Sequence, residues 1–138
     1  MVGAAHPYRE GGHIPELPQE QLERLDFLDL NGKDVAKDRK RAEKLTQALG
    51  ERLHKPVVSG SDTHQAVQYG CIWTEFAENS ITLDGLCRQI SKGAYRIVVS
   101  PQAAFQVKTA CILKRALKEI HALGGDYVSV LLDSEKGM

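Results

Sequence analysis

Apolar and polar residues alternate along this chain in short blocks whose spacing changes repeatedly from strand-like to helix-like. Apolar runs at residues 2–5, 26–30, 57–58, 71–74 and 95–99 predict strands. Between them, apolar residues spaced three and four apart predict helices over residues 18–25, from Asp34 to about Leu53, from Thr82 to Gly93, and from about Phe105 to Leu123. Alternating strands and helices are typical of an α/β fold with mostly parallel strands, here one domain over residues 1–138.

Residue chemistry at the ends of these blocks sharpens their boundaries. Asp34 and Thr82 are predicted helix caps, and Gly93 and Gly124 are predicted helix ends. Within residues 82–93 we expect Leu83, Leu86 and Ile90 to face inward, and we expect Trp73 in the core. Residues 7–18 are predicted to form a long loop, and residues 127–132 fit either a strand or a last helical turn.

The charge balance argues against a protein that binds nucleic acid or membranes through its overall field. Lys plus Arg and Asp plus Glu each number 18. No apolar run reaches the roughly 20 residues needed to cross a bilayer, and the N-terminus lacks the features of a signal peptide. The three cysteines form no C-x-x-C pair, which favours buried free thiols in a reducing cytoplasm.

Chemistry is concentrated where predicted strands end. The strand at residues 57–58 leads into Ser59-Gly60-Ser61-Asp62-Thr63-His64, and His6 follows the first strand directly. A carboxylate and imidazoles in such positions suit Zn, Mn or Fe. Asp-x-His is also common as a turn-capping Asp followed by an exposed His, and His6 alone also fits a surface residue of a frayed terminus.

Three motifs in order resemble one family. They are His6-Pro7-Tyr8-Arg9, then residues 28–33 (LDLNGK), then residues 58–64 (VSGSDTH). In order and spacing they are similar to the later motifs of the PHP (polymerase and histidinol phosphatase) superfamily, including its PHP-associated segment. The resemblance covers residues 2–76, and it implies the C-terminal part of a distorted seven-stranded β/α barrel.

The resemblance also implies a site and an activity. Family members are metal-dependent phosphoesterases, so His6, Asp62 and His64 are expected metal ligands for Zn, Mn or Fe. Asp62 would also orient the nucleophile. Arg9 would hold a phosphate oxygen, unless it is a solvated loop residue. The register of Asp29 against the family's acidic position is open, so Asp29 is not assigned as a ligand.

One departure from the family bears on function. The family opens with a His-x-His motif on its first strand, and this chain contains none. We therefore expect the first strands and their ligands to be absent, and the metal site to be incomplete. The expected function is a phosphoesterase (hydrolase) domain or fragment acting on a phosphorylated small molecule or a nucleic-acid end. The alternative is a non-catalytic metal-binding or regulatory domain. The expected partners are a missing N-terminal half or a second copy of the chain.

Overall fold

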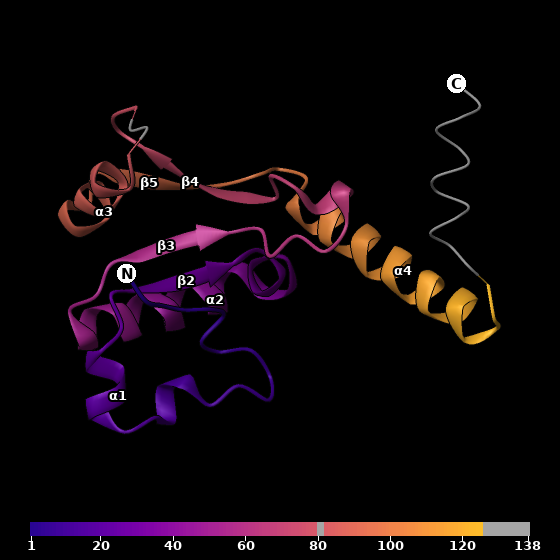
Figure 1. Ribbon diagram of the computed structural model, residues 1–138, viewed down its shortest axis with the longest axis horizontal. Coiled ribbons are helices and arrows are strands. Elements are labelled where there is room, and N and C mark those ends of the chain that lie inside the picture. The colour runs from indigo at the N-terminus through magenta and orange to yellow at the C-terminus, as the bar shows by residue number, and fades with distance from the viewer. Residues whose placement is uncertain (80–81, 126–138) are drawn as a thin grey trace.

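The computed structural model describes residues 1–79 and 82–125, which form two small sheets with associated helices (Figure 1). Strands β1 (Gly3–Ala4), β2 (Phe27–Asn31) and β3 (Val57–Gly60) make a parallel sheet in that order. Strands β4 (Ile72–Phe76) and β5 (Tyr95–Val99) form an antiparallel ribbon. The mixed α/β class is confirmed, and the described residues form no closed barrel.

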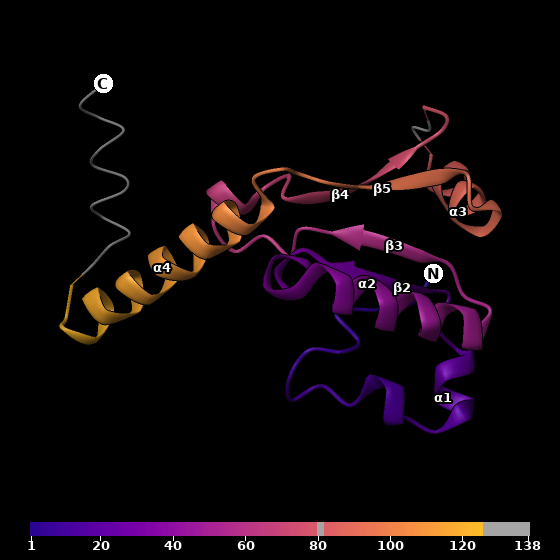
Figure 2. The same cartoon turned by 180° about the vertical axis from the view of Figure 1, so that it is seen from behind.

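Four α-helices and two short 3-10 turns complete the described part of the chain. These are η1 (Ile14–Glu16), α1 (Gln19–Glu23), α2 (Gly32–Leu53), η2 (Ala66–Gln68), α3 (Leu83–Lys92) and α4 (Ala103–Ala122). Figures 1 and 2 show α2 against the parallel sheet, the β4–β5 ribbon beyond β3, and α4 leading away from the body. The parallel sheet therefore lies between α2 and the ribbon.

The prediction of mostly parallel strands is right for the first sheet and wrong for the second. Ile72 pairs with Val99 and Phe76 pairs with Tyr95. The connection containing α3 starts and finishes at one end of the ribbon, where Ala77 N donates to Ala94 O at 3.0 Å. Because α3 does not cross back over a sheet, the two strands meet antiparallel.

The hydrophobic core lies mainly between the parallel sheet and α2. Leu28 is fully buried, and Leu30, Leu49 and Val57 are nearly so. At Gly50, an added Cβ would lie 2.9 Å from Val57 Cγ2, so a glycine is needed for α2 to approach β3 this closely. This packing fixes the direction of β2 and β3, and with it the place where their ends meet.

Helix α2 is capped three residues earlier than the sequence predicts. Its cap is Asn31, whose side chain accepts from Lys33 N at 2.9 Å, and the predicted cap Asp34 lies inside the first turn. Asp38 has non-helical backbone angles and accepts from Arg41 N at 3.0 Å, so it caps a second segment and kinks α2. The hydrophobic pattern continues across this kink, which is why the sequence predicts one straight helix.

The outer edge of β3 is closed by side chains of the ribbon. Ser59 N donates to Thr74 Oγ1 at 2.8 Å, and Thr74 Oγ1 donates to Ser59 O at 3.1 Å. Tyr95 Oη donates to Val57 O at 2.8 Å. These contacts satisfy edge groups that would otherwise be open to another strand.

The remaining predictions concern the second half of the chain. Thr82 caps α3 through Gly85 N and Gly93 ends it, as predicted. Leu83 is exposed, and Trp73 is 40% exposed because it faces away from Ile72 across the thin ribbon, so both are wrong as core residues. All three cysteines are free, but Cys111 is exposed and only Cys71 is fully buried. The prediction for residues 127–132 lies outside the described residues.

Within the part of the chain that the structure describes, no helix combines the length and the apolar character that a membrane crossing requires.

Candidate active site

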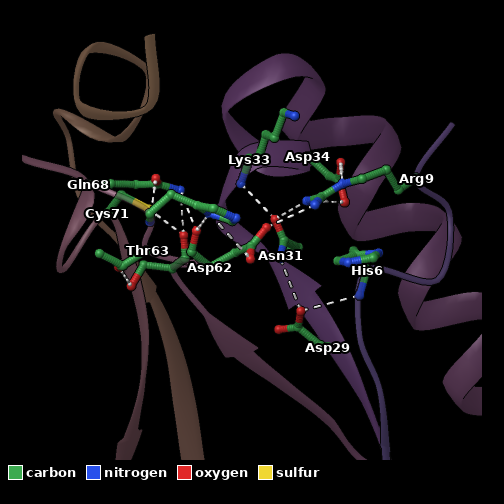
Figure 3. Close-up of polar contacts among 12 residues, drawn as sticks. His6, Arg9, Asp29, Asn31, Lys33, Asp34, Asp62, Thr63, Gln68 and Cys71 are labelled. Atoms are coloured by element: carbon green, nitrogen blue, oxygen red, sulfur yellow. Dashed lines mark hydrogen bonds and ion pairs between the residues drawn. The ribbon is translucent and has the colours of Figure 1, made fainter. Parts of the chain in front are cut away.

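The three parallel strands end at one edge of their sheet, and polar side chains gather there (Figure 3). His6 lies just after β1, and Asp62 lies just after β3. Asp29 and Asn31 lie at the C-terminal end of β2. Asp29 pairs with Val58, and Asn31 pairs with Gly60, so the ends of β2 and β3 are in register. This is the edge at which sites form in open parallel sheets.

Arg9 is the hub of this group, which we call the strand-end cluster (His6, Arg9, Asp29, Asn31, Asp34 and Asp62). Its Nη1 donates to Asp62 Oδ2 at 2.8 Å, and its Nη2 donates to Asn31 Oδ1. Its Nε and Nη2 donate to the two oxygens of Asp34 at 3.3 and 3.4 Å. All three guanidinium nitrogens therefore have partners in the protein. For Arg9 to hold a phosphate, as the sequence predicts, it must exchange at least one of them.

The charges in the cluster shift the acid-base balance of its members in opposite directions. Burial works to raise the pKa of Asp62, but the hydrogen bond and charge of Arg9 outweigh it and hold that pKa below its ordinary value. Burial raises the pKa of Asp29, and its hydrogen bonds from Asn31 and His6 offset this only in part. The contacts of Asp62 thus stabilise its ionised form, whereas burial disfavours the ionised form of Asp29.

The loop that carries Asp62 is held by a buried glutamine. Gln68 Nε2 donates to Ser61 O at 2.8 Å and to Asp62 O at 2.9 Å, and Gln68 Oε1 accepts from His64 N at 3.3 Å. All three contacts are to backbone groups. Gln68 therefore fixes the path of the loop without occupying the carboxylate or the imidazole.

His64 is oriented by the same loop. Its Nδ1 lies 2.8 Å from Asp62 O, and because a carbonyl only accepts, Nδ1 carries the proton in that contact. Nε2 is then the nitrogen with a free lone pair, the arrangement usual for metal-binding histidines. Asp62 Oδ1 lies 3.8 Å from His64 Nδ1, so the two predicted ligands are close neighbours.

Two of the three predicted ligands have strained backbones. His6 has φ 37° and Asp62 has φ 49°, and His54, at the end of α2, is the only other non-glycine residue with positive φ in the described part of the chain. His6 N donates to Asp29 Oδ2 at 3.3 Å, which helps to hold this conformation. Strain of this kind is concentrated at functional sites and costs about 1–3 kcal/mol per residue.

The structure brings the predicted residues together unevenly. Asp62, His64 and Arg9 are in contact or nearly so. His6 is linked to them only through its backbone N, which bonds Asp29, and through Asn31, which bonds both Asp29 and Arg9. Among residues 1–79 and 82–125, no three His, Cys, Asp or Glu side chains are grouped closely enough to hold a metal ion. Carboxylate and imidazole groups are ligand types that Zn, Mn and Fe accept.

Sequence reasoning gave no site role to Asn31 and left that of Asp29 open. Asn31 is central because it caps α2, bonds Arg9 and donates to Asp29 Oδ2 at 3.3 Å. Asp29 and Asn31 stand two apart on β2 and therefore face the same side, a signal that strand periodicity offers. The sequence pattern does not reveal that Gln68 holds this loop, because its contacts depend on the path of a loop with no regular structure.

The comparisons with known proteins agree with the fold and with one family. Residues 40–95 match a family model described as PHP-associated, which supports a C-terminal segment of the PHP superfamily in this part of the chain. A solved structure, PsfC from Pseudomonas syringae PB-5123, is similar with a TM-score of 0.64 and 20% identity. The match covers 83% of this chain but 45% of PsfC, so this chain spans about half the length of that protein. No curated protein matches.

Proposed function

We propose that this chain contributes the C-terminal part of a PHP-type, metal-dependent phosphoesterase site. The observation that carries the proposal is the strand-end cluster, in which His6 and Asp62 keep strained backbones at the ends of the two strands that flank β2. Neither strained residue ends a helix, where a positive φ is routine. A functional demand for these two side chains explains why the strain is kept.

His6, Asp62 and His64 would hold a divalent ion of Zn, Mn or Fe type. An ion bound there supplies a water of lowered pKa as the attacking nucleophile. Oδ1 of Asp62 and Nε2 of His64 are the donor atoms that the contacts above leave for it. Further ligands would come from outside the described residues, as in a barrel of which β1, β2 and β3 form one arc.

Arg9 would change partners during function. Without an ion, its guanidinium supplies the positive charge next to Asp62 and Asp34. When a metal ion neutralises Asp62, the attraction that holds Arg9 Nη1 is weakened, and the guanidinium becomes available to a phosphate oxygen. We therefore expect Arg9→Gln to strengthen Mn²⁺ binding while it lowers any phosphoester hydrolysis.

The test is metal titration combined with an activity assay. Purified protein is titrated with Mn²⁺ by calorimetry and assayed on p-nitrophenyl phosphate. We expect Asp62→Asn, which tolerates the left-handed backbone, to weaken Mn²⁺ binding by at least about tenfold. Asp84→Asn, an exposed change on α3, is the matched control. Equal Mn²⁺ binding by both variants and the parent would refute the assignment of Asp62.

A non-catalytic binding domain is the second candidate. The observation in its favour is the pairing of Arg9 with Asp62 and the incomplete set of ligands among the described residues. Metal binding that depends on Asp62, without hydrolysis of any phosphomonoester, would favour this function for the chain on its own.

A further inference from the structure

Two neighbouring cavities open beside the strand-end cluster. The smaller, about 140 Å³, is lined by Asp62, His64 and Gln68 and by residues of α4. The larger, about 550 Å³, lies between the start of α2 and α4. Arg9, Lys33, Val107 and Cys111 line both, so the two cavities adjoin, and the smaller one reaches the candidate metal ligands Asp62 and His64.

The lining of these cavities is more basic than the chain as a whole. Charges of the whole chain balance at 18 of each sign. The cationic lining residues are Arg9, Lys33, Lys37, Lys108 and Lys114, and the anionic ones are Glu10, Asp34 and Asp62. Two of these three acids, Asp34 and Asp62, form ion pairs with Arg9. The surplus positive charge therefore belongs to the lysines.

These lysines are available to a ligand. Across the described residues, Lys37 pairs with Glu10 at 3.8 Å, whereas the ammonium groups of Lys33, Lys108 and Lys114 have neither an ion pair nor a hydrogen bond within the protein. They come from two elements far apart in sequence, α2 and α4. A basic concavity of this size is matched to a small anion.

We propose that these cavities bind a second phosphate group, so that the substrate is a small molecule carrying two phosphates. This inference rests on the proposed function, which assigns the first phosphate to the site at Asp62 and His64. The second phosphate binds Lys33 and Lys108 in the larger cavity, and Lys114 extends the basic lining toward His64. Phosphate oxygens accept strong hydrogen bonds from ammonium groups.

A small molecule is favoured over a nucleic-acid end by the limited extent of the basic surface. Strand binding requires positive charge along several successive phosphates and gives a net basic domain. Here the chain is neutral, and the surplus charge is concentrated in two adjoining cavities.

The test measures anion binding without metal, and so separates this inference from the proposed function. Chelator-treated protein is titrated calorimetrically with inorganic pyrophosphate and with inorganic phosphate at low ionic strength. We expect pyrophosphate to bind more tightly. We expect Lys33→Ala and Lys108→Ala each to weaken its binding by about tenfold, as for loss of one charge-assisted contact. Lys40→Ala, on the exposed side of α2 and in neither cavity, is the matched control.

Three outcomes would overturn the inference. They are the absence of pyrophosphate binding, equal weakening by Lys40→Ala, and a ten-nucleotide oligothymidylate that binds more tightly than pyrophosphate with a steep salt dependence. Because no metal is present, pyrophosphate binding that depends on the lysines stands even if Mn²⁺-dependent hydrolysis is never observed. Loss of hydrolysis alone therefore counts only against the proposed function.

Discussion

The parallel sheet with α2 and the ribbon with α4 are built in different ways. In the first region, Leu28 is 0% exposed and Leu49 is 2% exposed, so the elements are joined by apolar packing. In the second, only Ala103, Val107 and Ala110 of α4 are buried, and Leu123 is 88% exposed. The second region joins the first through apolar side chains of the shared core, which are Cys71, Ile72, Ala103 and Val107, and through Thr74 and Tyr95, which bond to the backbone of β3. The two regions thus share one core, and they differ in how much of each helix it covers.

The largest effect should come from a core leucine of the first region. Leu28→Ala is expected to lower the free energy of unfolding by about 3 kcal/mol, because the side chain is fully buried and leaves a cavity. Leu113→Ala, at a 42% exposed position on α4, is expected to cost less than about 1 kcal/mol. Urea denaturation measures both. Equal losses would erase the contrast between the regions.

A smaller effect is expected from the glutamine that holds the Asp62 loop. Gln68→Leu removes one donor each from Ser61 O and Asp62 O, which keep Cys71 Sγ and His64 Nδ1 as donors, and it removes the acceptor of His64 N, at a cost of about 1–2 kcal/mol. It should also weaken Mn²⁺ binding, which a change in stability alone would not do. Gln47→Leu, an exposed change on α2, is the control for both measurements. Unchanged Mn²⁺ affinity in Gln68→Leu would leave the glutamine with a structural role only.

The bonds between the two regions are tested by Thr74→Val, which keeps the shape of the side chain. Ser59 N then loses its acceptor at the edge of β3, at a cost of about 1 kcal/mol. Hydrogen exchange should show faster exchange of the Ser59 amide, with Leu28 and Leu30 amides unaffected. Thr63→Val, whose hydroxyl bonds only Ser61 Oγ, should leave the Ser59 amide unchanged. Slow exchange at Ser59 in Thr74→Val would mean that this bond does not hold the regions together.

The smallest effect should be a stabilisation. Because burial raises the pKa of Asp29, its proton is held more tightly in the folded state, so its contribution to stability falls as the pH rises through that pKa. Asp29→Asn keeps an oxygen that accepts from His6 N and Asn31 Nδ2. It should therefore stabilise the fold at pH 7 by less than about 1 kcal/mol. The gain should shrink as the pH falls toward about 4, and thermal denaturation at several pH values measures it.

Sequence reasoning succeeded where local chemistry decides the structure. Thr82 and Gly93 bound α3, and residues 95–99 form β5, because capping and strand patterns depend on near neighbours. The order of motifs also pointed to the superfamily segment now matched at residues 40–95. The expected barrel and the metal site are not tested by these observations and remain proposals.

Sequence reasoning failed mainly where contacts between residues far apart in the chain decide the structure. Trp73 looks like a core residue by type, but the ribbon has too few layers to cover it. Asn31 rather than Asp34 caps α2, because Arg9, 22 residues before Asn31, engages both side chains. The kink at Asp38 is likewise invisible in a hydrophobic pattern that runs straight through it. The exposure of Trp73 and the contacts of Asn31 with Arg9 depend on residues far along the chain, whereas the kink depends on the local contact between Asp38 and Arg41 N.

The left-handed backbone at Asp62 has a consequence for laboratory evolution of this protein. Glycine or asparagine adopts a φ of 49° more readily than aspartate does, so either substitution should ease refolding and raise heat tolerance. A library screened only for survival of heating would therefore enrich such changes at residue 62. The selected variants would be more thermostable, and they would have lost the carboxylate that accepts a hydrogen bond from Arg9.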